Sequence, residues 1–306
     1  MVKATTSDAT EAPYTAVPIV GLVAADAVPF PLYLRTARDV WVLYRPTHFA
    51  LDESHVGRLQ AEGVTQLFIR DADRDSYFAH VESTLPQILL ERGMPLERRA
   101  DVLYGVAKKV ALDLLTAPPD RDAVQRASRV MMATSGLLLR ETQGFAAIRK
   151  VMTGSRGLAA HSLTVGFMAM GLARNVLAGD AGTLLWAGLA GLLHDVGKVG
   201  HDGIGHDPEH PARGAEYLAR LGLPAPVVDA AMSHHERQDG SGYPTGLRGP
   251  MISELASVVG LADTFDKIYS AEQPRVGVFD ALRILAQAYR GCFEERFTRG
   301  LVKLFR

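Results

Sequence analysis

The sequence predicts a mainly α-helical protein, in which a small N-terminal α/β domain is followed by an all-helical bundle. Strand-forming runs occur only near the N-terminus, at residues 39–44 and 66–70. From about residue 77 onward, apolar residues recur at three- and four-residue spacing, which is typical of amphipathic helices. The 47% hydrophobic and 22% charged content is that of an ordinary globular protein.

The N-terminal elements follow from local signals. Polar residues at 1–15 predict a flexible terminus, and residues 16–95 are expected to form the α/β domain. Within it, residues 39–44 (DVWVLY) and 66–70 (QLFIR) are rich in strand formers, and 52–61 predicts a short helix with an acidic first turn.

The next segments predict helices. The apolar periodicity covers residues 81–92, 96–115 and 124–139, and the Pro118–Pro119 pair separates the last two. Residues 96–150 are interpreted as a helical linker or stalk. Their apolar stripes are also consistent with a dimer surface or with ordinary core packing.

Residues 151–306 are expected to form a separate helical domain after a glycine-rich break. Its central helix is 181–198, which is mostly apolar. The other expected helices are 158–177, 211–221, 225–235 and 252–269, with two more closing the chain.

Composition limits the classes of function. A net charge of −1 gives no global electrostatic case for binding a nucleic-acid polymer or an anionic membrane. The apolar run 184–193 is too short to span a bilayer, and prolines and Asp26 interrupt the run 16–34. With Cys292 as the single cysteine, no intrachain disulfide can form. We therefore expect a cytoplasmic protein.

The histidines give the strongest functional signal. Seven of the ten lie between His161 and His235, close to acids and glycines. Imidazole and carboxylate together are ligands of borderline divalent metals. His48, His55 and His80 are scattered and are expected at the surface.

The adjacent pair His194 and Asp195 follows an apolar run. Neighbouring helical positions diverge by about 100°, so the pair can reach two neighbouring metals with the carboxylate between them. Alone, the pair could equally be a helix-end acid and a satisfied core histidine. A second acid in an apolar helix, Asp263, favours a metal site, because buried unpaired carboxylates are costly.

Two further features stay ambiguous in isolation. Lys198 is either a cation favoured at a helix C-terminus or a charge aimed at a substrate phosphate. Residues 239–244 (DGSGYP) form a glycine-rich turn, in which Gly240 and Gly242 allow a close backbone approach and Tyr243 offers a ring for stacking. By itself this segment could be a plain turn.

The motifs occur in the order His161, 194–198 (HDVGK), 210–214 (HPARG), 234–236 (HHE), 239–244 (DGSGYP) and 262–266 (ADTFD). In this order they resemble the motifs of the HD-GYP domain, a branch of the HD metal-dependent phosphohydrolase superfamily. The resemblance covers about residues 150–305, and the N-terminal part looks like the small α/β domain that precedes some HD-GYP domains.

The resemblance implies an HD-type helical bundle that holds two or three metal ions, usually iron or manganese, and hydrolyses cyclic di-GMP. A hydroxide between the metals would attack phosphorus and give linear pGpG, with GMP as a further product. By position, His161, His194, Asp195 and Asp263 would surround the first metal, Asp195 would bridge, and His210, His234 and His235 would complete the second. Substrate contacts would come from Lys198, Gly240, Gly242, Tyr243 and Arg275, with Asp195 and Lys198 as the catalytic residues.

Three departures from the family pattern modify these expectations. Gly157 stands where three-metal members carry a glutamate, so we expect two metals. The segment 200–209 is short, which predicts a more open site. Glu272, or Gln273 in an alternative alignment, replaces the first cation of a basic motif that Arg275 partly keeps. One lost cation–phosphate contact is worth roughly 1.5–3 kcal/mol, or about tenfold to a hundredfold in affinity.

These departures keep two alternatives open. One is an HD-GYP protein of weak or absent activity that senses a nucleotide or binds a partner. The other is a hydrolase of a different cyclic dinucleotide. The expected partners are a cyclic dinucleotide, a second copy of the chain, and a diguanylate cyclase bound through the Gly-Tyr-Pro loop.

Overall fold

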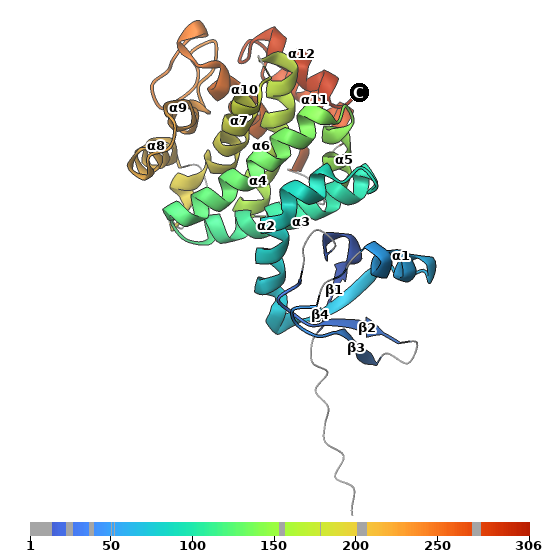
Figure 1. Cartoon of the computed structure of the whole chain (residues 1–306). Coiled ribbons are helices and arrows are strands. Elements are labelled where there is room, and N and C mark those ends of the chain that lie inside the picture. Colours follow the sequence, from blue (N-terminus) through green and yellow to red (C-terminus); the bar gives the residue numbers. More distant parts are fainter. Residues whose placement is uncertain are drawn as a thin grey trace, which may run out of the picture. The chain divides into compact units, whose positions relative to one another are not determined.

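The structure is a computed structural model that describes residues 14–22, 27–36, 40–49, 51, 53–152, 157–177, 179–200, 207–270 and 277–306. The chain divides into two compact units, Met1–Val102 and Leu103–Arg306. A small sheet lies in the first unit and the remainder is predominantly helical, which confirms the predicted fold class (Figure 1). The finer division at residues 15, 95 and 150 stays a prediction.

The first unit contains a four-stranded antiparallel sheet with strand order β1-β4-β2-β3. Val17, Leu32, Leu67 and Ile69 lie fully buried on the strands. The elements are β1 (Tyr14–Pro18), η1 (Ile19–Leu22), β2 (Leu32–Arg35), β3 (Trp41–Arg45), α1 (Glu53–Ala61), β4 (Gln66–Arg70), η2 (Asp71–Asp73) and α2 (Arg74–Leu90).

Two strands of this sheet were not expected. The prolines within residues 16–34 obscured β1 and β2, which are five and four residues long. In the sheet, β1 pairs with the distant strand β4, and β2 pairs with the next strand, β3, and through Tyr33 with Phe68 of β4. The surface expectation for His80 was also wrong: its ring is half-buried at 5.8 Å from the ring of Phe30, and burial lowers its pKa.

The second unit is helical over the part of the chain that the structure describes. Its helices are α4 (Arg121–Arg140), α5 (Gly144–Val151), α6 (Leu158–Val176), α7 (Ala181–Leu193), α8 (His210–Leu221), α9 (Ala225–Ser233), α10 (Glu254–Ser270), α11 (Val278–Ala288) and α12 (Glu295–Leu304). A further helix, α3 (Leu96–Thr116), contains the boundary between the two units. None of the described helices combines the length and apolar character that crossing a bilayer requires.

The helix α7 occupies the centre of this bundle and contacts α4, α6, α9 and α10 (Figure 1). It crosses α6 at two glycines: a Cβ on Gly191 would lie 2.7 Å from the Cα of Gly166. Contact this close requires glycine on both helices. The crossing lies five residues after His161 and three residues before His194, so it brings those two histidines near each other.

The predicted helix 181–198 was too long. The α-helix ends at Leu193, and a short 3-10 turn, η3 (Val196–Lys198), follows Asp195. Gly197 lies in this turn, and a Cβ there would lie 2.1 Å from the carbonyl oxygen of His210 and 2.7 Å from the amide nitrogen of Gly214. The turn therefore packs directly on the backbone of α8, next to the histidine that begins that helix.

Candidate metal centre

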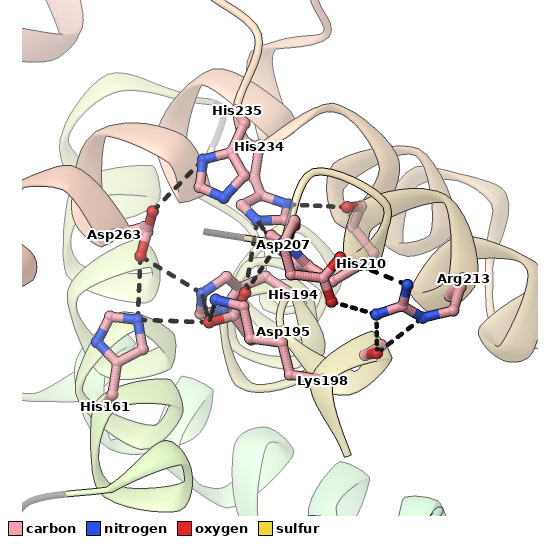
Figure 2. Close-up of polar contacts among 12 residues, drawn as sticks. His161, His194, Asp195, Lys198, Asp207, His210, Arg213, His234, His235 and Asp263 are labelled. Atoms are coloured by element: carbon pink, nitrogen blue, oxygen red, sulfur yellow. Dashed lines mark hydrogen bonds and ion pairs between the residues drawn. The ribbon is translucent and has the colours of Figure 1, made fainter. Parts of the chain in front are cut away.

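Five segments bring the seven predicted metal ligands to one place. The side chains point toward a shared space in the second unit (Figure 2). His161 lies on α6, His194 and Asp195 follow α7, His210 begins α8, His234 and His235 follow α9, and Asp263 lies in α10. Six of the seven are buried and His161 is half-buried.

Asp195 lies between two groups of imidazoles. Its Oδ1 is 3.0 Å from His210 Nε2 and 3.7 Å from His234 Nε2. Its Oδ2 is 3.4 Å from His194 Nε2 and 3.9 Å from His161 Nε2. Each oxygen of the same carboxylate therefore faces a different pair of ring nitrogens.

These contacts form two candidate ligand sets that share Asp195. Within each set, one donor atom per residue lies within 4.8 Å of the others. One set contains His161, His194 and Asp195, and the other contains Asp195, His210, His234 and His235.

Asp263 lies beside the first set. Its Oδ1 is 3.0 Å from His161 Nε2 and 3.5 Å from His194 Nε2. Its other oxygen faces away from these two rings and lies 2.8 Å from Lys267 Nζ. Asp263 can therefore complete the first set with a single oxygen.

The backbone fixes the orientation of three imidazoles. The Nδ1 atoms of His194, His210 and His234 donate to the carbonyl oxygens of Gly191, Asp207 and Ala231, each three residues earlier. A neutral ring that donates from Nδ1 presents a lone pair at Nε2. All three Nε2 atoms face the centre, as metal ligation requires.

Bound cations explain the arrangement of these donor atoms better than a core without metal does. His210 Nε2 and His234 Nε2 are 3.2 Å apart although both rings donate from Nδ1, so two lone pairs face each other. His194 Nε2 and Asp195 Oδ1 are buried and have no hydrogen-bond partner among the described residues. Buried polar atoms normally have partners, and a metal ion on each side of Asp195 would supply them.

The electrostatics of the metal-free centre follow from burial and from the two carboxylates. Burial lowers the pKa of His234 to about 4, so this ring is neutral at pH 7. Burial alone would also lower the pKa of His194, but Asp195 and Asp263 together raise it to about 9. Burial of Asp195 and Asp263 would raise the pKa of their carboxyls, but the neighbouring histidines hold both pKa values well below the usual range.

Two of the predicted substrate residues, Lys198 and Tyr243, contact this centre. Lys198 Nζ donates to Asp195 Oδ2 at 2.7 Å. Tyr243 stacks on His235 with ring centroids 4.6 Å apart. A Cβ on Gly242 would lie 2.5 Å from the Cα of Glu236, so glycine lets the loop pass over the metal-binding segment, and Gly240 has a φ of +79°.

Sequence reasoning missed three supporting residues. Asp266 Oδ2 lies 2.7 Å from His161 Nδ1. Glu236 accepts hydrogen bonds from the Thr245 amide at 2.7 Å and the Leu247 amide at 2.9 Å. Arg237 donates to the carbonyl oxygens of His234 and Glu236, which ties the end of α9 together. The three-residue spacing from Asp263 to Asp266 was a usable signal, because it puts both acids on one helix face.

Some predicted features lie outside the described residues. These are the basic substrate contact Arg275, its acidic neighbour Glu272, and most of the short segment 200–209. Their roles stay as predictions.

Comparisons with known proteins agree with this geometry. The HD domain model matches residues 158–268. A Pseudomonas aeruginosa protein named cyclic di-GMP phosphodiesterase is 32% identical over 224 residues, which cover 67% of this chain and 54% of the relative. A Vibrio cholerae protein named 3′3′-cGAMP-specific phosphodiesterase 3 is 33% identical over 129 residues, or 38% of this chain and 28% of the relative.

One solved structure resembles the whole fold. It is described as a HDG"Y"P protein from Bdellovibrio bacteriovorus, and it covers 96% of this chain and 99% of its own at a TM-score of 0.67 and 19% identity. The chain spans about half the length of the Pseudomonas relative, which it covers to 54%.

The fold and the site define a class of protein: a helical bundle whose histidine–aspartate centre is suited to two metal ions. Residues 158–268 of the chain match the HD domain, and the motifs along it resemble those of the HD-GYP branch.

Proposed function

We propose that this protein is a metal-dependent phosphodiesterase that hydrolyses cyclic di-GMP to linear pGpG. The central observation is Asp195, whose two oxygens face two separate groups of imidazoles. A shared carboxylate of this kind is typical of centres that hold two metal ions for phosphoryl chemistry. The Pseudomonas relative is named a cyclic di-GMP phosphodiesterase and the Vibrio relative a 3′3′-cGAMP-specific phosphodiesterase, which supports this substrate class.

The chain's own residues would hold and orient the metal ions. His161, His194 and Asp263 surround one side of Asp195, and His210, His234 and His235 surround the other. When bound, two iron or manganese ions would supply a hydroxide nucleophile near neutral pH and would neutralise charge on the phosphoryl oxygens. The Nδ1 hydrogen bonds to the backbone fix three of the rings before any metal arrives.

Other residues would position the substrate. The ammonium of Lys198 lies at the shared carboxylate, where it can bind a phosphate oxygen of the diester undergoing cleavage. Tyr243 stacks on His235 and so places the glycine-rich loop along the second group of imidazoles. Glu236 holds the far side of this loop through the amides of Thr245 and Leu247.

A different cyclic dinucleotide is the second candidate substrate. The Vibrio relative is named for 3′3′-cGAMP, which carries adenine in place of one guanine. Further cleavage to GMP, a homodimer and a diguanylate cyclase partner remain predictions from the family resemblance.

The test is a turnover assay on protein purified without oxygen and loaded with iron or manganese. We expect conversion of cyclic di-GMP to pGpG by the wild-type chain, about two metals per chain, and loss of turnover in Asp195→Asn. Faster cleavage of 3′3′-cGAMP would change the assigned substrate. Tight binding of both dinucleotides without any product would replace the enzyme by a nucleotide sensor.

A further inference from the structure

Few side chains of the metal centre reach solvent. The side chains of His161, Lys198 and Lys267 are 19%, 22% and 46% exposed, whereas those of Asp195 and Asp263 are 2% and 0% exposed. Among the described residues in contact with the centre's two carboxylates, Lys198 and Lys267 are therefore the exposed cations. The sequence motifs draw attention to only one of them, Lys198.

Lys267 lies on α10, one helical turn after Asp263. Its Nζ is 2.8 Å from Asp263 Oδ2, which is the oxygen that does not face His161 and His194. His235 Nδ1 lies 3.9 Å from the same oxygen, and His235 carries the stacked ring of Tyr243. The ammonium is therefore at the outer edge of the centre, near the substrate loop and not between the metal-binding groups.

The two lysines contact different parts of the centre. Lys198 contacts the carboxylate that both groups of imidazoles share, so it lies where the phosphate under attack would bind. Lys267 contacts the outer oxygen of a carboxylate that only one group uses. A cyclic dinucleotide carries two phosphodiesters, and the one that is not cleaved also brings a negative charge close to the centre. A cation that binds this second phosphodiester would stabilise its negative charge.

We propose that Lys267 binds the phosphodiester of the cyclic dinucleotide that is not being cleaved. The inference rests on the proposed function, because it assumes a substrate with two phosphodiesters. Lys267 thereby favours cyclic dinucleotides over substrates with a single phosphodiester.

The test compares two substrates in Lys267→Met, which removes the charge and keeps an unbranched chain. Cyclic di-GMP has two phosphodiesters, and bis(4-nitrophenyl) phosphate has one. We expect KM for cyclic di-GMP to rise about tenfold, a modest value for a charge-assisted contact because Lys267 is half-exposed. kcat and the metal content should change little, and kcat/KM for the single diester should fall less than twofold.

Two further variants control the result. Lys267→Arg keeps the charge and should restore KM for cyclic di-GMP to within about threefold of wild type. Lys303→Met removes an exposed lysine from α12 and should leave KM for both substrates unchanged.

Three outcomes would overturn the inference. An equal loss on both substrates would place Lys267 at the phosphate under attack. A fall in metal content would make it a positioning residue for Asp263. Unchanged kinetics on cyclic di-GMP would remove it from the substrate site. Failure of the proposed function is distinct, because wild-type protein would then cleave no cyclic dinucleotide at all.

Discussion

Asp266 holds the ring of His161 from behind: its Oδ2 lies 2.7 Å from His161 Nδ1, while His161 Nε2 faces Asp263 Oδ1 at 3.0 Å. The Nδ1 atoms of His194, His210 and His234 donate to backbone carbonyls, whereas the Nδ1 atom of His161 makes its hydrogen bond with a carboxylate. A carboxylate in this position fixes the ring and raises its basicity as a ligand.

Asp266→Ala should therefore weaken metal binding in the first group. Loss of a supporting carboxylate typically reduces metal affinity by about 10- to 100-fold. We expect metal titrations to show one site weakened by this amount and the other site unchanged. Asp280→Ala, which removes an exposed acid on α11, is the matched control. Equal weakening of both sites would contradict the assignment of Asp266 to His161 alone.

Metal affinity should rise with pH. The pKa of His194 in the metal-free protein is about 9, so its ring is protonated at pH 7. Metal ligation requires the neutral ring, and binding must therefore release a proton below about pH 9. The apparent affinity should increase by about tenfold per pH unit for one released proton between about pH 6 and pH 9. Calorimetry in buffers of different ionisation enthalpy measures this release, and an affinity that does not change with pH would contradict it.

Gly197→Ala should damage the second metal-binding group. The added Cβ would lie 2.1 Å from the carbonyl oxygen of His210, and the backbone of α8 cannot move without moving that histidine. Overpacking of this kind costs about 1–3 kcal/mol of unfolding free energy.

Denaturant unfolding and metal counts check this effect. We expect lower stability together with fewer than two metals per chain. Gly105→Ala is the control, because a Cβ within α3 meets nothing within 4 Å. That change should stabilise the protein by about 0.5–1 kcal/mol. Normal stability and normal metal content in Gly197→Ala would refute the close contact.

Glu236→Gln should loosen the substrate loop without removing metal. The carboxylate accepts from the Thr245 amide, the Thr245 hydroxyl at 2.8 Å and the Leu247 amide. A glutamine has only one acceptor oxygen, so at least one of these bonds is lost, at roughly 1–3 kcal/mol for the buried group left unsatisfied.

Hydrogen exchange of residues 239–247 reports on the loop. We expect faster exchange there, a severalfold higher KM for cyclic di-GMP and an unchanged metal content. Unaltered exchange would show that the loop does not depend on Glu236.

The sequence predicted the centre better than it predicted the small sheet. The motifs named the seven candidate metal ligands that the fold brings together, because chemistry at a metal demands particular residue types, but they did not assign Asp266 to His161. The strand 66–70 was predicted at its observed bounds, whereas β1 and β2 were missed because prolines interrupt the segment that contains them. The end of α7 was misplaced by five residues, and the turn that follows Asp195 makes a tertiary contact with α8 at Gly197 that no local pattern indicates. No local pattern assigned Glu236 to the loop, whereas the four-residue spacing from Asp263 to Lys267 was a usable signal that was overlooked.

The most direct test of the central claim is the position of the metals around Asp195. Anomalous scattering at the iron or manganese absorption edge, from crystals of metal-loaded protein, would locate them. We expect two peaks about 3.5–4 Å apart, one beside each oxygen of Asp195. A single peak, a third peak, or a pair of metals that Asp195 does not join would contradict the account.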